Sequence, residues 1–353
     1  MRVGLVLGAG GVVGGAWLTG GLHALASETG WDPGSADHIV GTSAGAMMGA
    51  LVAAGVPPWF MVAHSAGESF EGLRDADGRP AREANRSAGA IFKVDGRGVR
   101  LGPGSWRLGV NTLRDPARHW PAGLFAGWLP RGVISTEPLR ETVRRVVPTG
   151  WVRHSGLWVV ACDYENGDRV AFGRDDAPQA DLADAVAASC AIPAFYRPVK
   201  IGDREYVDGG LYSTSNLDLL RGLELDLVIC LNPTSSLHPS RAWNPAERVS
   251  AALRRVSGRR LGSEARGLRE DGVKVLLIQP LREDLETMGP NLMSTRRRHE
   301  VIELAMRTVA EQLRTAEHRD LLADLPAGEP HKLARPAGPP STWPALRPAV
   351  GGA

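Results

Sequence analysis

The 353-residue chain has few cysteines, little net charge and no long apolar run. Its three cysteines cannot form a disulfide framework and stand in apolar segments, so we expect buried free thiols and a reducing compartment. A formal net charge of +2 is too small to indicate nucleic-acid binding. No apolar stretch reaches the roughly 18 residues of a membrane-spanning helix, and the apolar start of the chain is too short for a signal peptide. We expect a cytoplasmic protein whose only membrane contact is peripheral, at the inner surface.

The chain also lacks any group of His, Cys and Asp residues with the spacing of metal ligands, so no metal site is predicted. It does have material for a core, because 43% of its residues are hydrophobic and 23% are charged, as in ordinary globular proteins. Segments with strand character alternate with segments with helix character. This alternation predicts a three-layer α/β/α domain with a mainly parallel central sheet, over residues 1–320.

The expected strands are short, apolar and bounded by turn residues. They lie near residues 3–7, 38–41, 156–162, 169–173, 198–201, 204–207, 225–231 and 274–278. The expected helices lie near residues 16–27, 44–54, 136–146, 180–188, 244–270 and 295–316.

Two segments break this alternation. Residues 67–130 are rich in Gly, Pro, Arg and Trp and show little periodicity, so we interpret them as a loop-rich lid or cap inserted in the domain. An insertion whose aromatic side chains only pack among themselves is the alternative. Residues 326–353 are rich in Pro, Ala and Gly without helical periodicity, and we expect this tail to be disordered.

The pentapeptide Gly41-Thr42-Ser43-Ala44-Gly45 lies between an expected strand and an expected helix. Gly-x-Ser-x-Gly in that context is the pattern of a nucleophile elbow, in which a sharp turn exposes the serine hydroxyl. Glycine on either side, at Gly41 and Gly45, allows such a turn. The helix that follows would direct its first amides at the serine, where negative charge develops during acyl transfer. An ordinary strand-to-helix turn with Ser43 as the helix N-cap is the alternative.

A second glycine-rich stretch, residues 8–15, follows the first expected strand. Its free amides could form an oxyanion hole or cradle the phosphates of a dinucleotide. The strict Gly-x-Gly-x-x-Gly pattern of dinucleotide sites fails, because Val13 stands at its third glycine. The acidic residue that should follow the second strand is also absent, since the serine turn occupies that position. An NADP-binding protein is therefore the less favoured interpretation.

A third motif, Asp208-Gly209-Gly210, closes an expected pair of strands. Together, and in this order, the three motifs resemble those of the patatin-like phospholipase family. The segment Ala187–Val199, with its Ala-Ser-x-Ala-Ile-Pro pattern, resembles the family sequence ahead of the aspartate. The resemblance covers residues 3–232 and extends to about residue 315, without the lid and the tail.

The resemblance implies a lipid acyl hydrolase with a patatin-like fold and no cofactor. Ser43 would be the nucleophile and Asp208 its base, in a dyad that forms an acyl-enzyme. The amides of Gly10, Gly11 and Ala44 would form the oxyanion hole. The substrate would be a lipid or another ester, and nothing specifies an oligomer.

One departure from the family pattern stands in the glycine loop. The family usually has Gly-Gly-Gly-x-Arg/Lys-Gly, whereas this chain has Ala9 at the first glycine and Val13 at the basic residue. Loss of the cation argues against phospholipids as the preferred substrate more than against ester hydrolysis itself. A catalytically weak lipid-binding or lipid-transfer protein is the alternative function. A Ser-His-Asp triad through His238 or His299 is the alternative mechanism.

Overall fold

The computed structural model describes residues 1–68, 70, 92–95, 102–114, 126–236 and 245–343. Eight strands form one sheet in the order β5-β6-β3-β2-β1-β7-β8, with β4 paired to β3 outside this path. The strands are β1 (Val3–Leu7), β2 (His38–Thr42), β3 (Leu157–Asp163), β4 (Arg169–Phe172), β5 (Val199–Ile201), β6 (Arg204–Asp208), β7 (Leu227–Leu231) and β8 (Lys274–Ile278). All eight expected strands are present.

The five strands β3, β2, β1, β7 and β8 run parallel to one another. By contrast, β4 and β6 pair antiparallel with β3, and β5 pairs antiparallel with β6. The central parallel strands are almost wholly buried, as expected for a sheet covered on both faces. The predicted mainly parallel α/β/α architecture is confirmed.

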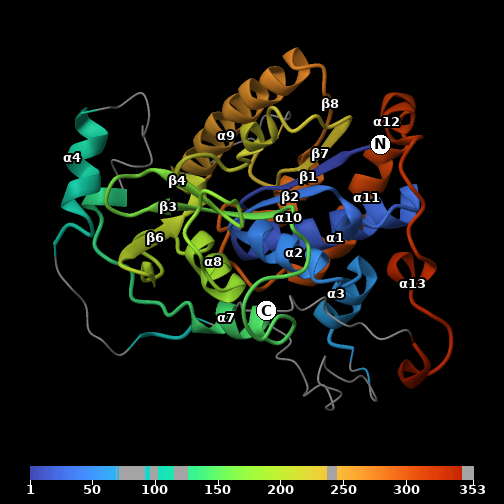
Figure 1. Cartoon of the computed structure of the whole chain (residues 1–353), viewed down its shortest axis with the longest axis horizontal. Coiled ribbons are helices and arrows are strands. Elements are labelled where there is room, and N and C mark those ends of the chain that lie inside the picture. The colour runs from blue at the N-terminus through green and yellow to red at the C-terminus, as the bar shows by residue number, and fades with distance from the viewer. Residues whose placement is uncertain (69, 71–91, 96–101, 115–125, 237–244, 344–353) are drawn as a thin grey trace.

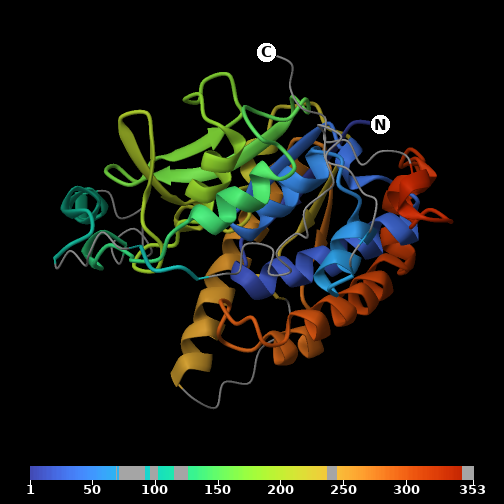
Figure 2. The same ribbon diagram turned by 90° about the horizontal axis from the view of Figure 1, so that it is seen from below.

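Helices cover both faces of this sheet (Figure 1 and Figure 2). The longer ones are α1 (Gly11–Thr29), α2 (Ala44–Ala53), α3 (Pro58–Ser65), α4 (Trp106–Arg114), α7 (Glu137–Arg144), α8 (Leu182–Ser189), α9 (Pro245–Glu270) and α11 (Arg298–Leu313). The shorter ones are α10 (Arg282–Met288), α12 (Ala316–Leu322) and α13 (Pro330–Leu333). Short 3₁₀ turns complete the fold at η1 (Pro33–Ser35), η2 (Gly209–Leu211), η3 (Leu217–Leu220) and η4 (Pro340–Thr342). None of the described helices is both long and apolar enough to cross a membrane.

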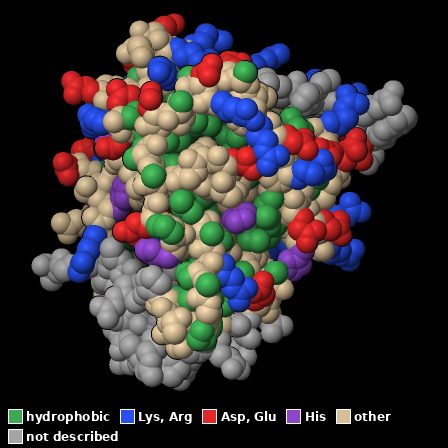
Figure 3. Space-filling model, turned by 90° about the vertical axis from the view of Figure 1, so that its right-hand side faces the viewer, with side chains coloured by type: hydrophobic (Ala, Val, Ile, Leu, Met, Phe, Trp, Pro, Cys, Tyr) green, Lys and Arg blue, Asp and Glu red, His purple; other side chains and the backbone are tan. Residues whose placement is uncertain are grey.

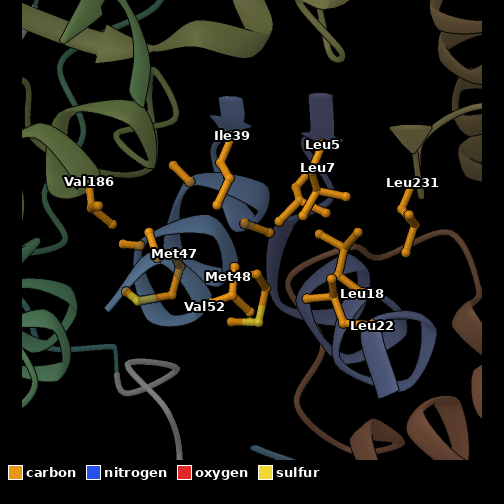
Figure 4. Close-up of a cluster of buried hydrophobic side chains, with 14 of the residues drawn as sticks. Leu5, Leu7, Leu18, Leu22, Ile39, Met47, Met48, Val52, Val186 and Leu231 are labelled. Carbon is orange, nitrogen blue, oxygen red and sulfur yellow. The ribbon is translucent and has the colours of Figure 1, made fainter. Parts of the chain in front are cut away.

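Alternate residues of each strand enter different cores, because successive side chains point to opposite faces of a sheet. Leu5 and Leu7 of β1 join the larger core under α1, α2, α8 and α11 (Figure 4). Val6 joins the smaller core under η3 and α9. All three side chains are fully buried, so the apolar runs of the sequence reflect burial on both faces.

Two boundaries differ from those expected. Helix α1 begins at Gly11, inside the stretch interpreted as a glycine loop, because Gly10 already serves as its N-cap. The described part of the tail, up to residue 343, is packed rather than extended away from the domain. There the Trp59 indole donates to the His331 carbonyl at 3.0 Å, and Trp343 lies edge-on against Trp59 with ring centroids 5.5 Å apart. An apolar residue, Trp343, anchors a segment whose composition alone suggested disorder; residues 344–353 lie outside the described part.

The predicted lid lies only partly within the described residues. Helix α4 and residues 126–130 are the main described pieces of it. Leu108 and Ala126 bury their side chains against Cys162, Tyr164 and Val207, at the ends of β3 and β6. Two aromatic residues of the predicted lid, Trp120 and Phe125, lie outside the described residues.

Candidate active site

Ser43 lies between the end of β2 and the start of α2, and its side chain is almost fully buried. Its backbone has φ 54° and ψ −120°, a region that residues with a side chain rarely adopt. Such strain costs of order 1–3 kcal/mol and persists only where the surroundings impose it. The turn therefore has the sharp geometry that the pentapeptide predicted.

The glycines on either side are required by close packing of backbone on backbone. A Cβ atom on Gly45 would collide with the carbonyl oxygen of Leu7 at the end of β1. One on Gly41 would lie 2.6 Å from the Cα of Ala46. Only glycine lets α2 begin this close to the sheet.

Asp208 ends β6 and comes beside Ser43 through the pairing of strands. It lies opposite Ala161 of β3, and β3 lies next to β2. The side chain of Asp208 is 5% exposed. Burial raises the pKa of Asp208 to about 6, against the lowering effect of hydrogen bonds from the Ser43 side chain and the Gly210 amide. The Gly210 amide donates to Asp208 Oδ1 at 2.7 Å.

The two motif glycines after Asp208 serve different contacts. A Cβ on Gly209 would collide with the carbonyl oxygen of Val160. Gly210 supplies the amide that binds the carboxylate. A Cβ atom on Gly210 would lie 3.6 Å from the Cβ of Ala9 in the glycine loop, so the two residues are neighbours. The Asp-Gly-Gly motif thus fits between the end of β3 and the loop after β1.

Sequence reasoning did not single out Ser189, the last residue of α8. Its Oγ accepts a hydrogen bond from the Ser43 amide at 2.9 Å and donates to the Val160 carbonyl at 2.5 Å. Ser189 is fully buried. The only signal for it in the sequence is its place in the Ala-Ser-x-Ala-Ile-Pro segment.

Cys190, the next residue, also reaches the serine. Burial and the charge of Asp208 raise the pKa of its thiol well above the usual value, although a hydrogen bond with Ser43 lowers it. A thiol in that state is protonated and unreactive at neutral pH. Cys162 and Cys230 are likewise buried and free, as expected from the sequence.

The glycine-rich loop lies against the elbow and against the segment that follows Asp208. The Ala9 amide donates to the Thr214 carbonyl at 2.8 Å, and the Gly14 amide to the Gly10 carbonyl at 2.9 Å. Gly11 has φ +61°, and a Cβ there would lie 2.8 Å from the Leu292 carbonyl oxygen. The loop conformation therefore depends on glycine at this position.

The amides expected in the oxyanion hole stand at two helix N-termini. Gly10 and Gly11 begin α1, and Ala44 begins α2. Amides of a first helical turn have no acceptor within their helix, and they favour a negative charge in front of them. A Cβ on Gly15 would lie 3.7 Å from that of Ala44, so the two helix starts are neighbours.

A sequence model of the patatin-like phospholipase family matches residues 5–221. The chain belongs to this family. Among solved structures, VipD from Legionella pneumophila aligns over 87% of this chain and 67% of its own, with 16% identity and a TM-score of 0.37. The strand-turn-helix around Ser43, the loop after β1 and Asp208 all lie within the matched residues.

The patatin-family loop differs here at Val13, and the structure gives a physical reason for its apolar side chain. Val13 is 4% exposed and packs in the larger core with Ala16 and Trp17. Its amide donates to the Leu292 carbonyl at 3.0 Å. A basic side chain at this position would have to be buried without a counter-charge, which is costly.

Of the two histidines considered for a triad, His299 is exposed at the start of α11, and His238 lies outside the described residues. Among the described residues, no group of three His, Cys, Asp or Glu side chains could hold a metal ion.

Proposed function

We propose that the protein hydrolyses lipid acyl esters with Ser43 as nucleophile and Asp208 as general base. Membership of the patatin-like phospholipase family supports lipid acyl hydrolysis as the general activity. The observation that carries the finer assignment is the burial of Asp208 beside Ser43, near enough for the Ser43 side chain to lower the pKa of the carboxyl. It pairs a strained serine with a carboxylate that can take its proton.

In the first half-reaction the Ser43 Oγ attacks the ester carbonyl carbon while its proton moves to Asp208. The carbonyl oxygen becomes an oxyanion, which the amides of Gly10, Gly11 and Ala44 stabilise. Each such donor is worth roughly 3 kcal/mol in hydrolases. Collapse of the intermediate breaks the bond to the alcohol, which leaves with the proton from Asp208.

In the second half-reaction a water molecule attacks the acyl-enzyme and gives its proton to Asp208. The fatty acid leaves, and Ser43 regains its proton. A pKa near 6 suits both steps, because Asp208 is ionised at neutral pH and still basic enough to accept a proton.

Covalent labelling by a fluorophosphonate probe tests the assignment. We expect the wild-type protein to be labelled, Ser43→Ala to be unlabelled and Asp208→Asn to be labelled at least tenfold more slowly. Cys190→Ala is the matched control, since that side chain also reaches Ser43 but has no role in the mechanism. A well-folded wild-type protein that the probe does not label would contradict the proposal and favour a lipid-binding or lipid-transfer protein.

A histidine triad makes a different prediction. Loss of nitrophenyl ester hydrolysis in His238→Ala or His299→Ala, with the fold intact, would replace the dyad by a triad. We expect both variants to keep their activity within about threefold.

We further propose that the protein contacts membranes peripherally through an apolar stripe on α4 and the residues packed beside it. Trp106, Leu113, Trp128 and Leu129 form this stripe, and they are 62%, 60%, 50% and 42% exposed. The Trp128 ring lies on α4 over Gly109, where a Cβ would be 2.9 Å from its Nε1. Exposed tryptophans are typical of surfaces that enter the headgroup region of a bilayer.

The position of the stripe fits this use. Helix α4 stands at one end of the molecule, beyond the end of β3 (Figure 1). The carboxyl ends of β2 and β3 meet at that edge because the two strands are parallel, so the stripe and Ser43 share an edge of the sheet. The face that shows α11, α12 and α13 instead has acidic and basic side chains intermingled among its described residues (Figure 3), a weaker surface for lipid contact.

A further inference from the structure

Arg254 is a buried cation on the inner side of α9. It is 9% exposed, and its Nη1 donates to the Pro233 carbonyl at 2.8 Å. No carboxylate among the described residues pairs with it, whereas Arg260 on the same helix bonds Glu264 at 3.0 Å. Burial alone lowers the pKa of Arg254 to about 10, so the guanidinium stays charged at neutral pH. A buried charge without a partner is costly, and this one needs an explanation.

Asn232 provides a second donor without a partner. It directly follows β7 and precedes Pro233, the residue whose carbonyl accepts from Arg254. Its side chain is fully buried, and its Nδ2 has no hydrogen-bond acceptor. The orientation of the amide is fixed, because Oδ1 accepts from Thr234 Oγ1 at 2.8 Å. Leaving a buried donor unpaired is unfavourable.

Hydroxyl groups complete this polar cluster. Ser257 lies three residues after Arg254, on the same face of α9. Its Oγ lies 2.5 Å from Thr214 Oγ1 and 3.2 Å from Thr234 Oγ1. The cluster therefore joins α9 to the residues that follow β7 and Asp208.

The cluster lies beside the glycine loop. A Cβ on Gly8 would lie 2.6 Å from Asn232 Oδ1, and one on Gly10 would lie 2.7 Å from Pro233 Cγ. Asn232 follows β7 and Ser43 follows β2, with β1 between these parallel strands. Two strand spacings separate their backbones by about 10 Å, so a phosphate held from Asn232 and an ester held at Ser43 can belong to one lipid molecule.

We propose that Arg254 and Asn232 form an anion subsite that binds a phosphate group, and that this group is the headgroup phosphate of a lipid whose ester lies at Ser43. The inference rests on the proposed function. Arg254 supplies the charge and Asn232 Nδ2 the directed donor, and both gain the partner that the described residues do not give them. A free phosphate ion has the same chemistry, so the experiment separates the two sources.

The first test compares substrates in mixed micelles: a phosphatidylcholine and a diacylglycerol with the same acyl chains. We expect Arg254→Met to raise KM for the phosphatidylcholine at least tenfold and to change that for the diacylglycerol less than twofold. Arg255→Met, an exposed neighbour on the same helix, is the control and should change neither. Equal losses on both substrates, or no loss on either, would overturn the subsite.

The second test does not require activity. We expect inorganic phosphate to raise the Tm of the wild type and not that of Arg254→Met. If phosphate stabilises the wild type but does not inhibit phosphatidylcholine hydrolysis, the ligand is a free phosphate and the lipid assignment fails. Absence of any phosphate effect on Tm overturns the subsite itself. Should Arg254→Met fail to fold, Asn232→Asp replaces the donor by a negative charge and is expected to abolish the same Tm shift.

The two proposals fail separately. A protein that fluorophosphonate does not label but phosphate stabilises would retain the subsite and lose the hydrolase. Conversely, the probe could label Ser43 equally in the wild type and in Arg254→Met, while Arg254→Met changes KM for the phosphatidylcholine no more than for the diacylglycerol. That result would retain the hydrolase and lose the subsite.

Discussion

The Ser189 hydroxyl holds the amide of Ser43, 146 residues away in the chain, at 2.9 Å. It bonds the Val160 carbonyl at the same time, so one side chain at the end of α8 ties the elbow to β3. Ser189→Ala leaves a buried donor and a buried acceptor unpaired, at about 1–3 kcal/mol of unfolding free energy. We also expect kcat for a nitrophenyl ester to fall at least tenfold, because the turn at Ser43 loses a constraint.

Urea unfolding and steady-state kinetics measure the two effects of Ser189→Ala. Ser27→Ala is the matched control, since that exposed hydroxyl bonds only carbonyls of its own helix. A Ser189→Ala protein with normal stability and normal kcat would show that Ser189 does not position the elbow.

The pKa of Asp208, raised by burial to about 6, predicts how activity depends on pH. The base must be ionised to take the Ser43 proton. We therefore expect kcat/KM to be low at pH 4, to rise through about pH 6 and to level off above it. A rise centred near pH 4 would mean that Asp208 is not the titrating base.

The same shift predicts how stability depends on pH. Because the folded pKa lies above the unfolded value of 3.8, the contribution of Asp208 is most favourable below pH 3.8 and is lost as pH rises through about 6. A shift of about two units corresponds to roughly 3 kcal/mol at most. Asp208→Asn, which keeps an acceptor for the Gly210 amide, should raise Tm at pH 8 and lose this advantage by pH 4. A Tm difference that does not change with pH would contradict the buried, ionised carboxylate.

Gly45 and Gly262 predict opposite effects of the same substitution. Gly45→Ala drives a Cβ into the Leu7 carbonyl, so we expect a loss of more than about 3 kcal/mol and of activity. Gly262 lies in α9 with no atom within 4 Å of a built Cβ. Gly262→Ala should therefore stabilise the protein by up to about 1 kcal/mol through helix propensity. Urea unfolding of the pair checks both, and equal effects would show that the contact at Gly45 does not constrain the elbow.

The apolar stripe on α4 predicts a separation between vesicle binding and catalysis. We expect the double variant Trp106→Ala, Trp128→Ala to bind phosphatidylglycerol vesicles at least tenfold more weakly in sedimentation, with nitrophenyl ester hydrolysis unchanged. Leu253→Ala is the control, because Leu253 is an apolar residue of α9 that is 63% exposed but lies outside the stripe. This variant should bind vesicles as the wild type does. Undiminished vesicle binding by the double variant would rule out the stripe as the contact surface.

Local patterns in the sequence determined much of this protein. Short apolar runs bounded by turn residues predicted the central strands β1, β2, β3 and β7, because strands buried on both faces need continuous apolar residues. Gly-x-Ser-x-Gly predicted the sharp turn at Ser43, because only glycine at positions 41 and 45 allows the backbone to pass so close to β1. The composition of the tail predicted disorder, but its part up to residue 343 packs on the domain. A composition does not show that one side chain, Trp343, is buried against Trp59.

Only the tertiary structure decided what surrounds that serine. The pairing of β6 with β3 brings Asp208 to Ser43, and the packing of α8 brings Ser189 to its amide. The burial of Arg254 behind the glycine loop likewise has no trace in the local sequence, which reads as a basic helix face. These relationships depend on which strands and helices are neighbours, and burial and hydrogen bonding between distant segments have no local pattern in the chain.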